Sequence, residues 1–107
     1  MTLPDTEARK ALFADPGTLF SRATDLVSAD LSGDMAILNL QTKTYFGLAD
    51  VGAFIWQQLE VSTNFRTILN ALMNEFEVNE SQCAADLEKF LDKLIQIGLL
   101  TANTAMK

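Results

Sequence analysis

The period of the hydrophobic residues changes once along this chain, after Leu48, and this change constrains the fold more than any other feature. Before it, apolar and polar side chains alternate over short runs, as in half-buried β-strands. After it, apolar residues recur at intervals of three and four, as along one face of an α-helix. Because strands followed by helices are typical of an α+β domain, we expect a three-stranded antiparallel β-sheet followed by three helices.

Turn signals divide the first part into three predicted strands, at residues 26–31, 35–40 and 44–48. The turns are Ser32-Gly33-Asp34 and Gln41-Thr42-Lys43, which are rich in residues that favour tight turns. In each strand, alternation places a set of apolar residues on one face. The sets are Val27, Ala29 and Leu31 in the first strand, Ala36, Leu38 and Leu40 in the second, and Phe46 and Leu48 in the third. These spacings suit an antiparallel meander.

The second part predicts three amphipathic helices, each with a candidate residue to cap its N-terminus. The candidate caps are Asp50 for the first helix, Ser62 or Thr63 for the second, and Asn79 or Ser81 for the third. Gly98 is expected to end the third helix in a left-handed conformation. Trp56 lies off the apolar stripe of the first helix, so we expect it to be partly exposed.

A length of 107 residues indicates a single domain. We divide the chain into a loosely packed N-terminal arm at 1–20, the domain at 21–101 and a C-terminal tail at 102–107. Leu19 and Phe20 are the expected anchors of the arm, and the alternative is a short helix or an extra strand packed on the domain. No signal-peptide core and no run of about 18 apolar residues is present, so we expect a cytoplasmic protein with no membrane partner.

The composition excludes most catalytic chemistry. The chain has no histidine and one cysteine, so it lacks an imidazole base, a Ser-His or Cys-His pair and a His-ligated metal site. Nothing near Cys83 is suited to lower its pKa, and the carboxylate pairs of the helices are expected to be solvated. The sequence therefore predicts a protein that is not an enzyme and needs no cofactor or metal.

A winged-helix transcriptional regulator is an alternative, because a small sheet with three helices suits that shape. A recognition helix must offer cations to phosphates, however, and the formal net charge of this chain is −6. We therefore expect no nucleic-acid partner.

The third predicted strand, residues 43–48, would lie at an edge of the meander. It has no proline and one charge, Lys43, so little in it prevents pairing with an incoming strand. The alternative is that a helix or the N-terminal arm covers this edge, and the composition favours neither.

An ordered set of motifs over residues 24–100 resembles a known family. A strand with Tyr45-Phe46-Gly47-Leu48 precedes a helix with Val51-Gly52-Ala53, Ile55 and Trp56, and the later matches are Thr63, Leu72, Phe76, Cys83, Asp86-Leu87, Phe90-Leu91, Leu94 and Gly98-Leu99-Leu100. These features resemble the PqqD-like recognition elements for precursors of ribosomally synthesised and post-translationally modified peptides (RiPPs). The founding member of that family is the coenzyme PQQ synthesis protein D.

The resemblance implies a winged helix-turn-helix-like domain that captures the leader of a precursor peptide. The leader would add as a strand to the third strand, in a groove whose other wall is the third helix. Carried onto this chain, the binding residues would be Lys43, Thr44, Tyr45, Phe46, Gly47 and Leu48 with Cys83, Asp86, Leu87, Phe90 and Lys93. The implied partners are the precursor and a modifying enzyme. The motifs look closer to proteins that serve lasso-peptide leader peptidases and cyclases than to the PQQ protein, which serves a radical SAM enzyme.

Overall fold

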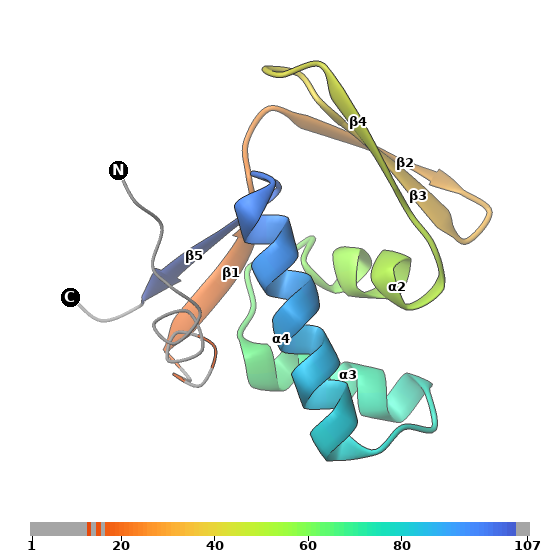
Figure 1. Ribbon diagram of the computed structural model, residues 1–107, viewed down its shortest axis with the longest axis vertical. Helices are drawn as coiled ribbons and strands as arrows, with labels where there is room; N and C mark the ends of the chain where they lie inside the picture. Colours follow the sequence, from red (N-terminus) through yellow and green to blue (C-terminus); the bar gives the residue numbers. More distant parts are fainter. Residues whose placement is uncertain (1–12, 14, 16, 105–107) are drawn as a thin grey trace.

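The computed structural model describes residues 13, 15 and 17–104, and they form two small sheets and three helices (Figure 1). The elements are, in order, β1 (Thr18–Arg22), β2 (Leu26–Leu31), β3 (Asp34–Asn39), β4 (Thr44–Leu48), α2 (Asp50–Gln58), α3 (Phe65–Glu75), α4 (Glu80–Gln96) and β5 (Leu100–Thr104). The antiparallel meander has the order β2-β3-β4, and β1 pairs with β5 in a separate two-stranded sheet. The predicted α+β class, with three strands followed by three helices, is confirmed.

The two-stranded sheet corrects the predicted ends of the domain. β1 and β5 are antiparallel, with Phe20 opposite Ala102, so residues 18–20 and 102–104 are part of the folded body. Phe20 is fully buried, whereas Leu19 is 38% exposed, so Phe20 is the anchor of the two. The alternative of an extra strand thus describes residues 18–22, and residues 1–12, 14, 16 and 105–107 lie outside the described part of the chain.

One face of the meander packs against the helices. It is not the face on which alternation places most of the apolar residues of β2 and β3. Met35 and Ile37 of β3 are buried, while Val27 and Leu31 of β2 are at least half exposed. Val27, Ala29 and Leu31 of β2, and Ala36 and Leu38 of β3, therefore lie on the outer side of the sheet. Alternation predicts which residues share a face, but the contact with α2 decides which face is covered.

The prediction that Trp56 is partly exposed is wrong, because its side chain is fully buried. Its indole Nε1 donates a hydrogen bond to Ser28 Oγ on β2 at 3.1 Å. The Arg22 guanidinium lies 4.6 Å from the centre of the indole ring and donates to the Trp56 carbonyl oxygen at 2.6 Å. Trp56 thus joins α2 to both sheets, a role that the helical period alone does not reveal.

The helix ends agree with the predictions only in part. α2 is preceded by Ala49, which makes no side-chain cap, so the prediction of Asp50 as its cap is wrong. Asn64 caps α3, by accepting from the Thr67 backbone, in place of Ser62 or Thr63. Asn79 caps α4 as predicted, and Gly98 has the expected left-handed conformation, with φ of 84°.

Candidate functional site

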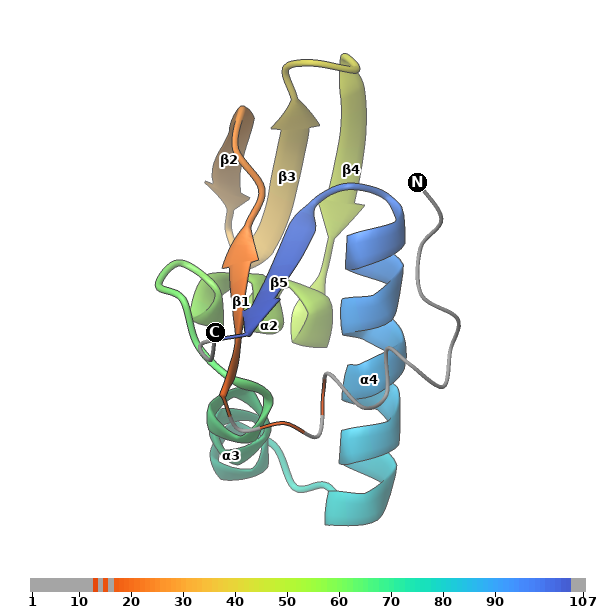
Figure 2. The same ribbon diagram turned by 90° about the vertical axis from the view of Figure 1, so that its left-hand side faces the viewer.

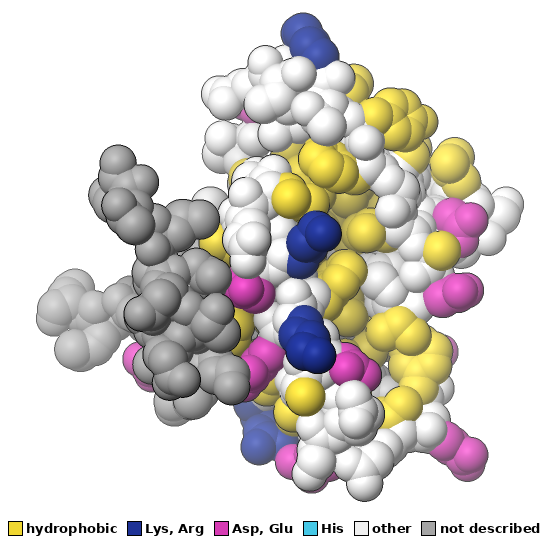
Figure 3. Space-filling model, viewed as in Figure 1, with side chains coloured by type: hydrophobic (Ala, Val, Ile, Leu, Met, Phe, Trp, Pro, Cys, Tyr) yellow, Lys and Arg dark blue, Asp and Glu magenta, His cyan; other side chains and the backbone are white. Residues whose placement is uncertain are grey.

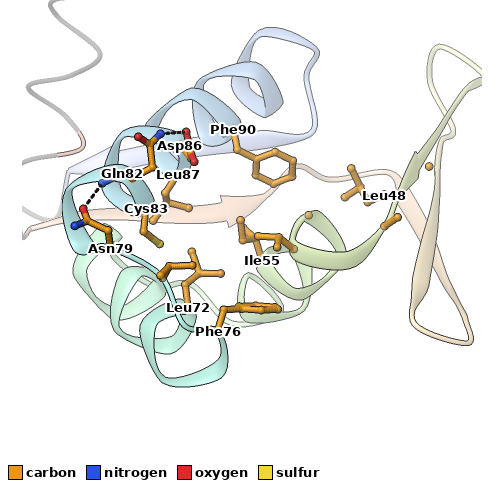
Figure 4. Close-up of a pocket in the computed structure, with 15 residues that line it drawn as sticks. Leu48, Ile55, Leu72, Phe76, Asn79, Gln82, Cys83, Asp86, Leu87 and Phe90 are labelled. Carbon is orange, nitrogen blue, oxygen red and sulfur yellow. Dashed lines mark hydrogen bonds between the residues drawn. The ribbon is translucent and has the colours of Figure 1, made fainter.

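An apolar cavity of about 580 Å³ lies between the C-terminal part of β4 and the N-terminal half of α4 (Figure 4). We call it the β4–α4 cavity. Its lining residues are Gly47, Leu48, Ala49, Val51, Gly52, Ile55, Leu72, Phe76, Val78, Asn79, Gln82, Cys83, Asp86, Leu87 and Phe90. Figure 3 shows hydrophobic side chains gathered on this face, between the three-stranded sheet at the top and the lower helices.

The floor of the cavity is built where three helices meet. Ile55 of α2, Leu72 of α3 and Leu87 of α4 are all buried and line it. A side chain at Gly52 would begin 3.4 Å from two ring carbons of Phe90, so this glycine lets the Phe90 ring lie close to α2. The Phe90 ring therefore has a packed position at the boundary between α2 and α4, and it faces the β4 side of the cavity in Figure 4.

The polar side chains of the cavity lie along one rim and are held there by hydrogen bonds within α4 and its cap. Asn79 Oδ1 accepts from the Gln82 backbone N–H at 3.1 Å, and Gln82 Nε2 donates to Asp86 Oδ1 at 2.9 Å (Figure 4). These bonds hold the rim in place at the start of α4. They leave the floor to apolar groups, which is the usual arrangement in a site that receives apolar side chains.

Cys83 lies on the cavity wall, and its environment disfavours the thiolate. Burial raises the pKa of the Cys83 thiol, and the nearby Asp86 carboxylate raises it further. A catalytic cysteine needs the opposite shift, toward a stable thiolate at neutral pH. The thiol therefore contributes to the cavity as a small apolar group.

The hydrogen-bond register shows which backbone groups of β4 point away from the sheet. The Leu40 N–H donates to the Asp25 carbonyl oxygen on the β2 side, and the Asn39 carbonyl oxygen accepts from Lys43 on the β4 side. The backbone groups of Asn39 therefore face β4, and alternate residues of β3 share that direction.

Through the β3–β4 register, this alternation fixes the direction of every residue in β4. Asn39, Ile37 and Met35 are opposite Thr44, Phe46 and Leu48, respectively, so these β4 residues bond to β3. Tyr45 and Gly47 direct their N–H and C=O groups outward, and no strand among the described residues pairs on that side. The edge of the meander thus offers two donors and two acceptors beside the cavity.

The structure brings together only some of the predicted site residues. Gly47, Leu48, Cys83, Asp86, Leu87 and Phe90 line the cavity, whereas Lys43, Thr44, Tyr45, Phe46 and Lys93 do not. Of the β4 residues outside the lining, Tyr45 supplies outward backbone groups, while the backbone groups of Thr44 and Phe46 bond within the sheet.

Sequence reasoning missed the contribution of the first two helices to the cavity. Val51 and Gly52 of α2 and Leu72 and Phe76 of α3 line the cavity, whereas the sequence places them only among the motifs of the resemblance. One signal was available: Val51 lies at the start of its helix, directly after the edge strand, so it had to lie close to the end of that strand.

Within residues 13, 15 and 17–104, no group of three or more Cys, Asp or Glu side chains could hold a metal ion. In the same part of the chain, no helix is both long enough and apolar enough to cross a membrane.

Comparisons with known proteins agree on one kind of relative. Residues 34–100 match the family described as coenzyme PQQ synthesis protein D. The chain is similar to the structure described as TbiB1 in complex with the TbiA(beta) leader peptide, with 36% identity and a TM-score of 0.72, over 75% of this chain and 93% of that one. A lasso peptide synthetase B1 complexed with the leader peptide shares the fold, with 21% identity and a TM-score of 0.64, over 77% of this chain and 96% of that one. No curated protein matches the chain.

Proposed function

Because the chain belongs to the coenzyme PQQ synthesis protein D family, we propose that it binds the leader segment of a ribosomally made precursor peptide and presents it to modifying enzymes. The observation that carries the proposal is the open edge of β4 beside the β4–α4 cavity. An extended peptide can extend the sheet through main-chain bonds while alternate side chains enter the cavity. The identity with TbiB1, whose structure contains a leader peptide, supports the same ligand class here.

The energetics require both parts of this site. Four outward backbone groups, each worth about 0.5–1.5 kcal/mol net, contribute about 2–6 kcal/mol. Association costs about 4–15 kcal/mol, so main-chain pairing alone does not bind a peptide. Two or three apolar side chains that enter the cavity add about 1.5–3 kcal/mol each. The apolar side chains of the leader therefore decide whether it binds.

The proposed role is binding and presentation, with the chemistry done by a separate enzyme. The partners proposed for the loaded protein are a lasso-peptide leader peptidase and a cyclase. Both similar structures are B1 proteins, and one is described as a lasso peptide synthetase, which favours this type over delivery to a radical SAM enzyme. A DNA-binding role is not favoured, because the net charge is −6 and α4 carries four acidic and only two basic side chains.

The test uses isothermal titration calorimetry with synthetic leader peptides of any short precursors that are encoded next to the gene for this protein. Val51 lines the cavity and is 44% exposed, so we expect Val51→Glu to fold while placing a charge in the path of the apolar side chains. We expect its affinity for the leader to fall at least about tenfold, which corresponds to about 1.4 kcal/mol.

Gln57→Glu is the matched control, because it adds the same charge at an exposed position of α2 outside the cavity lining. It should bind the leader as the unaltered protein does. Equal affinities of the Val51→Glu and unaltered proteins would remove the cavity from the site, and an unaltered protein that fails to bind the leader would overturn the proposed function.

A further inference from the structure

Gly47 is in the middle of an edge strand, although neither its conformation nor its packing requires a glycine. Its φ lies outside the left-handed region, and a side chain built there would meet no heavy atom within 4 Å among the described residues beyond its chain neighbours. Glycine weakens a strand, because it loses more backbone freedom on folding and contributes no side chain to packing. A strand glycine without a structural reason often marks a place where a ligand approaches closely.

The outer surface of the sheet beside Gly47 is low and apolar. Gly47 is opposite Ala36, which is in turn opposite Ala29, so the three form a row of small residues across the sheet. The neighbouring row is Tyr45, Leu38 and Val27, and the Tyr45 side chain is 69% exposed. A step therefore separates the two rows on the side of the sheet that faces away from the helices.

A peptide strand added to β4 would present one side chain at this step. The leader residue that exchanges backbone bonds with Gly47 points to the same side of the sheet as Gly47 would, toward the outer surface. Its two neighbours in the leader lie opposite Phe46 and Leu48 and point to the helix side, where the β4–α4 cavity lies. The two surfaces of the sheet thus receive alternate residues of the same leader.

We propose that Gly47 is a specificity-determining residue, which selects leaders with an aromatic residue at the position paired with it. The inference rests on the proposed function and names the peptide class: an aromatic residue between two apolar ones. The aromatic ring would lie across Gly47 and Ala36 with the Tyr45 side chain at its diagonal, an arrangement in which an aromatic cross-strand neighbour covers an edge glycine.

The experiment compares Gly47→Thr with Ala29→Thr by calorimetry with the same leader peptide. Ala29 belongs to the same row and is exposed, but it lies on β2, two strands away from the open edge of β4. Because threonine favours strands, both variants should fold with a melting temperature equal to or above that of the unaltered protein. We expect Gly47→Thr to lose at least tenfold in affinity and Ala29→Thr to stay within twofold.

A second measurement replaces the aromatic leader residue by alanine. We expect this change to lower the affinity of the unaltered protein at least tenfold. It should lower the affinity of the Gly47→Thr protein less than twofold, because the leader's aromatic ring can no longer lie across residue 47. Gly47→Ala, the smallest addition, repeats the comparison should the threonine variant not fold.

The outcomes separate this inference from the proposed function. If both Gly47 variants bind the leader with unchanged affinity while Val51→Glu does not bind, the selection by Gly47 is wrong and the leader site stands. If alanine substitutions in the leader cost equal amounts in the Gly47→Thr and unaltered proteins, the pairing of Gly47 with an aromatic residue is also wrong. If no leader binds the unaltered protein, both proposals fall.

Discussion

Cys83 reports on the cavity directly, because it is the only cysteine of the chain and lies on the cavity wall. Its pKa is raised by burial and by Asp86, so at a given pH the folded protein holds less of the reactive thiolate than an unfolded chain does. A reagent that alkylates the thiolate therefore measures both the electrostatics and the occupancy of the cavity.

We predict that folded Cys83 reacts with iodoacetamide at pH 8 several-fold more slowly than the same residue in urea-unfolded protein. The rate should still be rising at pH 9, where an ordinary thiol is half ionised, because a raised pKa moves the titration to higher pH. The leader peptide at a saturating concentration should slow the reaction further. Mass spectrometry of the single thiol measures the rate, and a folded protein that reacts as fast as the unfolded one would contradict the prediction.

At the scale of the element, β4 divides its residues between two tasks. Phe46 bonds to Ile37 in β3 and holds the meander together, whereas Tyr45 and Gly47 point their backbone groups away from it. Loss of the backbone N–H of Phe46 would therefore weaken the sheet, whereas loss of the N–H of Tyr45 would weaken only leader binding. Proline, which lacks that N–H, separates the two tasks.

We predict that Tyr45→Pro folds and weakens leader binding about tenfold, since the loss of one bond leaves a leader carbonyl unpaired at a cost of about 1–3 kcal/mol. Phe46→Pro is the matched change one residue away. It should lower the free energy of unfolding by about 1–3 kcal/mol, because it breaks the ladder between β3 and β4. Calorimetry with the leader and urea unfolding measure the two effects. Equal stabilities of the two variants would contradict the assigned register.

The sequence predicts some of the elements and contacts of the fold but not others. The strands at 26–31 and 44–48 and the Asn79 cap could be predicted, because alternation and capping are local properties of the chain. The burial of Trp56 could not, because it depends on Ser28 and Arg22, which are distant in the sequence and contact the indole from two different sheets.

Only the part of the cavity that is lined by residues implied by the family resemblance could be predicted. Leu87 and Phe90 belong to a helical pattern that also fits a buried core, so their period does not distinguish the two roles. Leu72 reaches the same cavity from α3 through a helix crossing that depends on long-range packing. The outward direction of Tyr45 and Gly47 likewise requires the pairing register, and a shift of one residue would reverse it.

At the scale of the whole molecule, the sheet of β1 and β5 joins the two ends of the domain (Figure 2). Phe20 exchanges backbone bonds with Thr63 on one side, so its neighbours Leu19 and Ser21 are the residues that bond to β5. Thr101 is opposite Ser21 and bonds to it, whereas Ala102 is opposite Phe20 and its backbone groups face away.

We predict that Thr101→Pro lowers the free energy of unfolding by about 1–3 kcal/mol, because it removes a bond that closes the domain. For a domain of this size, each kcal/mol corresponds to a fall in melting temperature of about 4–8 °C. Ala102→Pro, the neighbouring change, should have a smaller effect. Leader affinity of the folded protein should stay unchanged in both variants, because β4 belongs to the other sheet. Scanning calorimetry measures the melting, and a more stable Thr101→Pro than Ala102→Pro would contradict the pairing.

The pairing of β1 with β5 also makes the domain a transferable module. Thr18 and Thr104 are direct partners in the ladder, so the polypeptide enters and leaves the folded body at neighbouring points. Domains with adjacent ends tolerate insertion into a loop of another protein and fusion at either end. Figure 1 shows that these ends lie across the molecule from β4. A host enzyme could therefore carry this fold as an internal segment and still leave the β4 edge open.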